Sequence, residues 1–158
     1  APQTASIVTT SATYTGSPIV RAITCSGGGT PTPANVSGTT VGSYSGSAIS
    51  CSAVGNYALT NGLTTAAFSI TQATQAAVTV TAQSVTYPTA FASLAATGGS
   101  GTGGYTFALG SAGTAGCSVV GSTLSYTSAG TCTVTATKAS DTNYLVVSSA
   151  AQTTMDSG

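Results

Sequence analysis

Apolar and polar residues alternate over short stretches along most of the chain. In residues 131–137, TCTVTAT, the side chains of Cys132, Val134 and Ala136 fall on one side of an extended backbone and the threonines on the other. A period of two is the pattern of a β-strand with one buried face. The residues that this pattern predicts to face a core are Ile49, Cys51, Ala53, Phe68, Ile70, Val78, Val80, Ala82, Tyr105, Phe107, Leu109, Leu124, Tyr126, Cys132, Val134 and Ala136.

Turn-forming residues separate these strands. Gly- and Pro-rich stretches lie at residues 26–33, 98–104 and 110–116. No segment keeps the 3.6-residue period of a helix over three turns, and there is no run of about 20 apolar residues to span a membrane. The pattern therefore predicts an all-β chain without a membrane span. Alternation alone leaves open whether the strands form a sandwich or a β-grasp-like sheet.

The chain contains an internal repeat. The stretch QTASIVTTSATYTGS from Gln3 resembles QAAVTVTAQSVTYPT from Gln75, and this alignment places Tyr14 opposite Tyr87. A unit repeated over this length is a domain rather than one turn of a solenoid.

Two further similarities support the repeat. The stretch SAISCSAV resembles SAGTCTVT, which aligns Cys51 with Cys132, and the Asn-Tyr dipeptide at 56–57 recurs at 143–144. Each dipeptide precedes an apolar, strand-like run. We therefore expect two tandem modules, residues 1–73 and 74–158.

Four cysteines, Cys25, Cys51, Cys117 and Cys132, define the redox chemistry of the chain. They form no C-x-x-C pair, and the chain has no histidine to complete a zinc site. An even number in a β-rich chain predicts two disulfides and an oxidising compartment, with four buried thiols in a cytosolic protein as the alternative. Because each module holds one pair, we expect the bonds Cys25–Cys51 and Cys117–Cys132.

Charge is almost absent from the sequence. Only 3% of residues are charged, the net charge is zero, and the charged residues are Arg21, Lys138, Asp141 and Asp156. This composition offers no electrostatic basis for binding nucleic acid or an anionic membrane. Acid–base catalysis needs placed pairs of titratable groups, and no histidine is present to activate a serine or threonine. We expect no enzymatic activity, no cofactor and no metal site.

Several short motifs have an ordinary structural interpretation. Residues 99–104 match G-x-G-x-x-G, but a strand-like run follows where a dinucleotide fold needs a helix, so we expect a loop between strands. Lys138, Asp141 and Asn143 lie close together, which favours a salt bridge in a turn over a Lys–Asn isopeptide bond. Repeated threonines fit the solvent face of strands, with ice binding or O-glycans as alternatives. Asn35 begins an N-glycosylation acceptor sequence that we expect on a loop.

The second module resembles a known repeat. Residues 116–144 read GCSVVGSTLSYTSAGTCTVTATKASDTNY. This stretch is similar to the bacterial immunoglobulin-like repeats that occur in tandem in large secreted and cell-surface proteins. The first module resembles the related repeats that open with Tyr-x-Gly-x-Pro, although residues 26–46 depart from their pattern. The residues that match are Cys117, Gly121, Leu124, Ala129, Gly130, Cys132, Asp141 and Tyr144 in the second module, and Tyr14, Gly16, Pro18, Gly55, Asn56 and Tyr57 in the first.

The resemblance implies two immunoglobulin-like β-sandwich domains, each with one disulfide, in an extracellular stalk, adhesin or structural array. It carries no catalytic residues to this chain. The first residues, Ala-Pro-Gln, also suit a mature end left by signal peptidase, so we expect an extracellular or cell-surface location.

Two functions follow as expectations. The first is a self-assembling filament or surface-array subunit, because β-edges are normally guarded by lysine and this chain has one. Assembly would use residues 4–15 as a strand added to another copy, with Val8, Ala12 and Tyr14 in apolar slots. The second is a stalk or adhesin module that binds a glycan or host-surface ligand.

Overall fold

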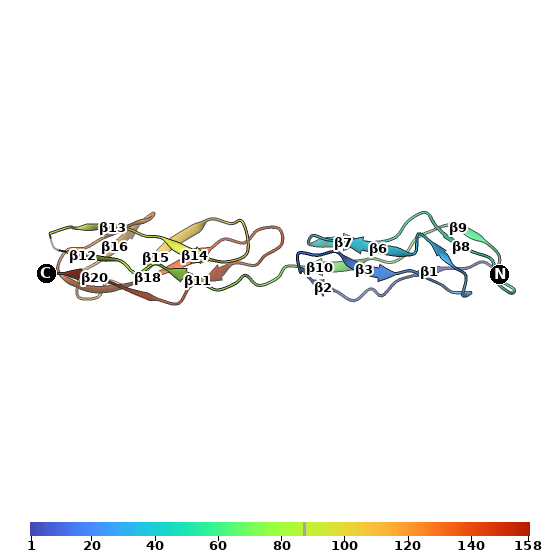
Figure 1. The fold of residues 1–158 in the computed structure, drawn as a ribbon, viewed down its shortest axis with the longest axis horizontal. Helices are drawn as coiled ribbons and strands as arrows, with labels where there is room; N and C mark the ends of the chain where they lie inside the picture. The colour runs from blue at the N-terminus through green and yellow to red at the C-terminus, as the bar shows by residue number, and fades with distance from the viewer. Residues whose placement is uncertain (87) are drawn as a thin grey trace. The chain divides into compact units, whose positions relative to one another are not determined.

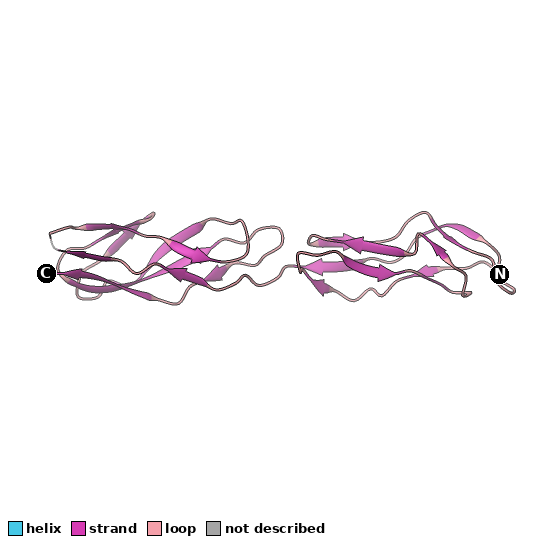
Figure 2. Ribbon diagram, viewed as in Figure 1, coloured by secondary structure: helices cyan, strands magenta, loops and turns pink. Residues whose placement is uncertain are grey.

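The computed structural model describes residues 1–86 and 88–158, and the described residues form strands and loops without a helix (Figure 2). Tyr87, the residue aligned with Tyr14, lies outside the described residues. The chain divides into two compact units, Ala1–Ala73 (unit 1) and Thr74–Gly158 (unit 2). Figure 1 labels most of the strands of each unit. The all-β class predicted from the alternating pattern is therefore confirmed.

Unit 1 contains ten short strands in several ladders. β10 lies between β2, to which it is parallel, and β7, to which it is antiparallel; β8 lies between β5 and β9, and β1–β4 and β3–β6 form antiparallel pairs. The strands are β1 Ala5–Ser6, β2 Ala12–Thr13, β3 Ile19–Ala22, β4 Thr24–Cys25, β5 Pro31–Thr32, β6 Asn35–Gly38, β7 Gly42–Tyr44, β8 Ile49–Cys51, β9 Thr60–Leu63 and β10 Phe68–Thr71.

The core of unit 1 joins side chains from three of these ladders. Ile49, Phe68 and Ile70, from β8 and β10, pack with Val36 of β6 and with Ile23, which lies between β3 and β4. Ile49 and Phe68 have no exposed surface. Separate ladders that enclose one apolar cluster are sandwich-like packing.

Unit 2 has longer ladders. One follows the order β12–β20–β18–β15, with β19 also paired to β18, another follows β13–β17–β16, and β11 pairs with β14. Its core is built around β18, whose Cys132, Val134 and Ala136 are buried as predicted. The strands are β11 Val78–Val80, β12 Ser84–Thr86, β13 Phe91–Ser93, β14 Ala96–Gly98, β15 Tyr105–Ser111, β16 Ser118–Val120, β17 Thr123–Ser125, β18 Gly130–Lys138, β19 Val147–Ser148 and β20 Gln152–Ser157.

Three residues predicted to face a core are exposed. Ala53 follows the end of β8, where the chain turns between Val54 and Tyr57. Ala82 lies in the crossing from β11, which pairs with β14, to β12, which pairs with β20. Leu109 is 37% exposed beside an irregularity in the β15–β18 register. In each case the alternation is interrupted where a strand ends or shifts its pairing.

Candidate functional site

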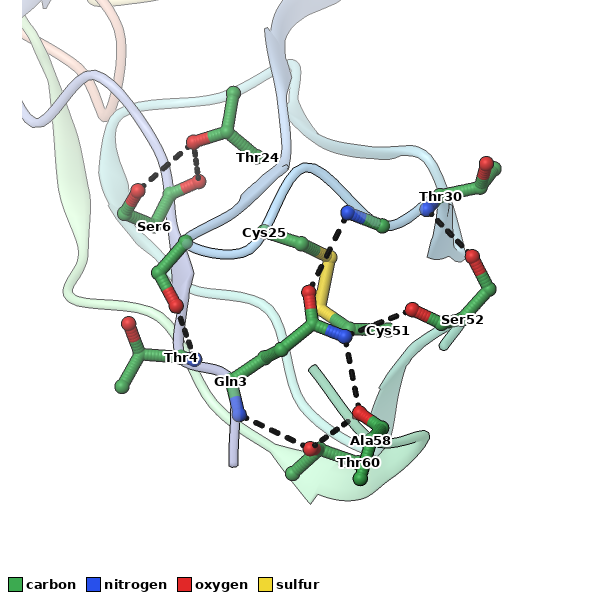
Figure 3. The surroundings of a disulfide bond; sticks show 12 residues. Gln3, Thr4, Ser6, Thr24, Cys25, Thr30, Cys51, Ser52, Ala58 and Thr60 are labelled. Atoms are coloured by element: carbon green, nitrogen blue, oxygen red, sulfur yellow. Dashed lines mark hydrogen bonds between the residues drawn. A yellow bond between two sulfur atoms is a disulfide. The ribbon is translucent and has the colours of Figure 1, made fainter. Parts of the chain in front are cut away.

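A buried glutamine connects backbone groups of two loops in unit 1. Gln3 is 2% exposed, and its Nε2 donates to the carbonyl oxygens of Ser52, at 2.7 Å, and Ala58, at 3.1 Å. Its Oε1 accepts from the N–H of Gly29 at 3.3 Å. Figure 3 shows the side chain reaching Ser52 and Ala58 beside the Cys25–Cys51 disulfide. The amide therefore satisfies backbone groups of two loops that no strand ladder pairs.

Unit 2 repeats this arrangement with Gln75. Its side chain is 8% exposed, and Nε2 donates to the carbonyls of Ala139, at 3.1 Å, and Leu145, at 2.8 Å. Its Oε1 accepts from the N–H of Gly101 at 3.0 Å. We call these two arrangements the glutamine clamps. Sequence reasoning missed both, although each aligned stretch of the repeat begins with its clamp glutamine.

The clamps correct one part of the sequence alignment. They match Ser52 with Ala139 and Ala58 with Leu145, which is the spacing of the Asn-Tyr dipeptides at 56–57 and 143–144. Cys51 therefore corresponds to Lys138, and the alignment of Cys51 with Cys132 is wrong. That alignment rests only on a short Ser-Ala-x-x-Cys similarity, at positions that do not correspond in the two units.

The strand register agrees with this correction. Cys51 opposes Thr60 in β9, whereas Cys132 opposes Thr154 in β20. Gly42–Tyr44, which opposes Phe68–Ile70 in β10, is the part of unit 1 that corresponds to the start of β18. The disulfides thus lie at different places in the two units: Cys25–Cys51 next to the clamp, and Cys117–Cys132 away from it.

A lysine stem occupies in unit 2 the place that the disulfide has in unit 1. Ala5 opposes Cys25 in β1–β4, and Gly99 corresponds to Cys25 because its N–H donates to Ala77 next to β11. The nearest atom to a Cβ on Gly99 is Cδ in the aliphatic stem of Lys138. Lys138 is 8% exposed, and its Nζ lies 4.4 Å from the centre of the Tyr105 ring. This lysine packs as an apolar stem with a cation–π contact.

The aspartate of the predicted turn binds backbone N–H groups. Asp141 Oδ2 accepts from the N–H of Thr102 at 2.7 Å, and Oδ1 accepts from the N–H groups of Asn143 and Tyr144, both at 2.9 Å. These bonds, that from Thr102 foremost, lower the pKa of Asp141 below its ordinary value because they stabilise the carboxylate.

The Gly-rich loop at 99–104 has internal partners for its N–H groups. Gly101 donates to Gln75 and Thr102 donates to Asp141. A strand, β15, follows the loop, in agreement with the expectation from sequence. The match to a dinucleotide motif therefore reflects a loop that holds the clamp and the turn together.

The remaining charged residues also turn inward. The Arg21 guanidinium lies 5.3 Å from the centre of the Phe68 ring, and its Nη2 donates to Thr10 O at 3.4 Å. Asp156 is 2% exposed, and its Oδ1 has no hydrogen-bond partner within the described part of the chain. No charged side chain lies exposed on a described strand.

The N-terminal segment pairs within unit 1. Ala12 opposes Ile70 in the parallel β2–β10 ladder, and the Tyr14 N–H donates to Thr71 O at 2.9 Å. The Tyr14 side chain packs against the core of unit 1, whereas Val8 is 59% exposed. Residues 4–15 thus form the first strands of their own unit in this structure.

The candidate glycosylation residue lies on a strand, where a loop was expected. Asn35 is the first residue of β6 and opposes Ala22. The expectation is wrong because the Gly- and Pro-rich stretch ends just before Asn35, and Asn35 begins the strand that pairs with β3. The Asn35 side chain is exposed, and Val36 beside it points into the core.

Comparisons with protein-family models, curated proteins and solved structures return no match. Within residues 1–86 and 88–158, no three His, Cys, Asp or Glu side chains gather as a metal site would require. The same residues include no helix that could cross a membrane.

Proposed function

We propose that this chain is an extracellular structural protein, made of two tandem immunoglobulin-like modules, that associates with other copies of itself and catalyses no reaction. The observation that carries the proposal is the location of the charges. Lys138 and Asp156 are buried, Arg21 lies against Phe68, and Asp141 binds backbone N–H groups. Strand edges in soluble proteins are normally guarded by exposed charge, so these edges are open to pairing.

Exposed apolar side chains support the same proposal. Val8 in unit 1, and Phe91, Val120, Val146 and Met155 in unit 2, are each at least 46% exposed. With zero net charge there is little repulsion between copies. A surface of this kind favours association over a dispersed monomer.

The pairing order of unit 2 supports the immunoglobulin-like assignment. A constant-type immunoglobulin domain packs a sheet with strand order A-B-E-D against one with C-F-G. The β13–β17–β16 ladder matches B-E-D, and β15–β18–β20 matches C-F-G. The resemblance to bacterial immunoglobulin-like repeats at residues 116–144 is independent of this pairing order. The two disulfides are compatible with an extracellular protein.

Electron microscopy of the native chain tests this function. We expect the purified chain to form filaments or arrays that are visible in negative stain. A matched sample with lysines at exposed strand positions should show fewer or shorter assemblies, since added charge guards the edges. Single particles of monomer size in the unmodified sample would contradict self-assembly.

A stalk or adhesin module is the second candidate, and the glutamine clamps favour it. Each unit has its own clamp built on the same plan, as modules in a longer array would. In that case the chain stays monomeric and binds a glycan or host-surface ligand, which a glycan array would detect. Glycosylation at the exposed Asn35 would be seen as a mass shift that N-glycosidase removes.

Strand donation by residues 4–15 is one form of the assembly. For Val8, Ala12 and Tyr14 to enter another copy, the segment must first leave β4 and β10 of its own unit. Deletion of residues 1–13 would test the mechanism only together with a Gln3→Ala control, because that deletion also removes the clamp of unit 1.

A further inference from the structure

One strand of unit 2 offers an edge with regularly spaced unpaired backbone groups. Ala139 N–H donates to Gly104 O at 2.9 Å, which makes Gly104 and Ala139 a hydrogen-bonded pair at the start of the β15–β18 ladder. Because antiparallel pairs alternate, the N–H and C=O groups of Tyr105, Phe107 and Leu109 point away from β18. Across the described residues, no strand pairs with that side of β15.

A groove runs beside this edge. Its volume is about 510 Å³, and it is lined by Tyr105, Thr106 and Phe107 of β15 and by Gly121 and Ser122 in the turn between β16 and β17. Tyr105 and Phe107 are half-buried and face the core layer, while Thr106 and Ala108 are exposed on the other face. An added strand would find backbone partners on β15 and apolar surface under its alternate side chains.

The edge lacks the features that normally block strand addition. Residues 105–111 contain no charged residue and no proline. The nearest cation, Lys138, is held over the Tyr105 ring inside the unit. The register irregularity lies at the end of β15, between Leu109 and Ser111, and leaves the first five residues straight.

We propose that β15 pairs antiparallel with β15 of a second copy of this chain, about a two-fold axis at Phe107. The unpaired groups are self-complementary in this register: Phe107 opposes Phe107 of the second copy, and Tyr105 opposes Leu109 of the second copy. Both copies then contribute a half-buried aromatic pair to one continuous sheet. This inference rests on the proposed self-association and names its surface.

The second copy is the occupant that the charges favour. An uncharged edge on a chain of zero net charge meets an identical edge without repulsion. The pairing is smaller than a standard interface of about 1,600 Å², so we expect a reversible dimer whose strength grows when several chains associate.

Cysteine pairs test the register directly. In the proposed dimer Thr106 opposes Ala108 of the second copy in a non-hydrogen-bonded pair, with Cα atoms about 4.5 Å apart, which a disulfide can bridge. A mixture of Thr106→Cys and Ala108→Cys chains should form a covalent dimer under mild oxidation. Each variant alone should form little of it, because neither position opposes itself. Thr79→Cys mixed with Ser93→Cys is the control, since both residues are exposed on other strands of unit 2.

The outcomes separate this inference from the proposed function. A covalent dimer only in the Thr106→Cys and Ala108→Cys mixture supports β15 pairing. Its absence from a chain that still sediments as an assembly, or equal crosslinking in the control, overturns β15 pairing and leaves self-association standing. A chain that sediments as a monomer at every concentration overturns both.

Edge charge provides a second readout that needs no oxidation. Thr106→Lys/Ala108→Lys places lysines opposite each other across the proposed pair, while the exposed positions leave the fold of unit 2 unchanged. We expect at least a tenfold rise in the dissociation constant, and recovery when this variant is mixed with Thr106→Glu/Ala108→Glu. The same number of lysines at Thr79 and Ser93 should leave the dissociation constant nearly unchanged; an equal loss there would contradict the inference.

Discussion

A buried glutamine amide organises the loops of each unit, and in unit 2 the Asp141 carboxylate adds to it. Gln75 joins the loop at 99–104 to the backbone at Ala139 and Leu145, and Asp141 holds the same loop from the opposite turn. In a small domain with few aromatic residues, these bonds replace part of the stability that a larger core provides. The loops are therefore sensitive to single polar substitutions.

Replacement of the clamp glutamine should destabilise its unit. Gln75→Leu leaves the Gly101 N–H and two carbonyls without the amide, and we expect unit 2 to lose about 2–3 kcal/mol. Gln83→Leu is the matched control, because the Gln83 side chain donates to the carbonyl of Thr81 two residues away, and it should change stability by less than about 0.5 kcal/mol. Urea unfolding measures both, and equal midpoints would show that the clamp is energetically neutral.

Acid should weaken unit 2 through Asp141. Its pKa is lower in the folded state than in the unfolded chain, so its contribution to stability is present above the unfolded value of about 3.8 and is lost as the pH falls through the folded value. Asp141→Asn should remove this dependence. Urea midpoints measured from about pH 6 to about pH 2 test it; parallel curves for the two proteins would assign the acid sensitivity to another group.

At the scale of strands, the two disulfides brace different parts of a shared plan. Cys25–Cys51 joins β4 to β8 and spans 26 residues of sequence. Cys117–Cys132 spans 15 residues and joins the residue just before β16 to β18. In unit 2, the stem of Lys138 occupies the position that corresponds to the Cys25–Cys51 disulfide of unit 1. Each unit therefore depends on its own covalent bond.

Removal of one disulfide should affect one unit. We expect Cys117→Ala/Cys132→Ala to cost unit 2 about 3 kcal/mol, and Cys25→Ala/Cys51→Ala to cost unit 1 slightly more, because the longer loop gains more chain entropy. Amide hydrogen exchange followed along the chain would locate the loss. Equal loss of protection in both units would contradict independent modules.

Alternation in the sequence predicts buried faces well where a strand stays in register with its neighbours. β10 and the part of β18 that pairs with β20 have this property, and the all-β class and the presence of two disulfides are confirmed. The prediction is wrong at Ala53, Ala82 and Leu109, where a strand ends or its register shifts. The clamps escaped prediction because a glutamine in a stretch of small and polar residues is expected at the surface unless its buried carbonyl partners are known.

At the scale of the whole molecule, the scarcity of charged residues is the dominant property. The charged side chains take part in internal contacts or lie buried, so association should depend little on ionic strength. It should depend instead on apolar surface and on open edges such as that of β15. Proteins that associate through exposed charge show the opposite behaviour.

The mass of the native chain as a function of concentration tests self-association most directly. Light scattering from about 10 µM to about 1 mM, in salt of about 0.01 M and about 0.5 M, should give masses that exceed the 15.0 kDa of one chain and rise with concentration alike in both salts. A constant mass of 15.0 kDa throughout this range would contradict the account.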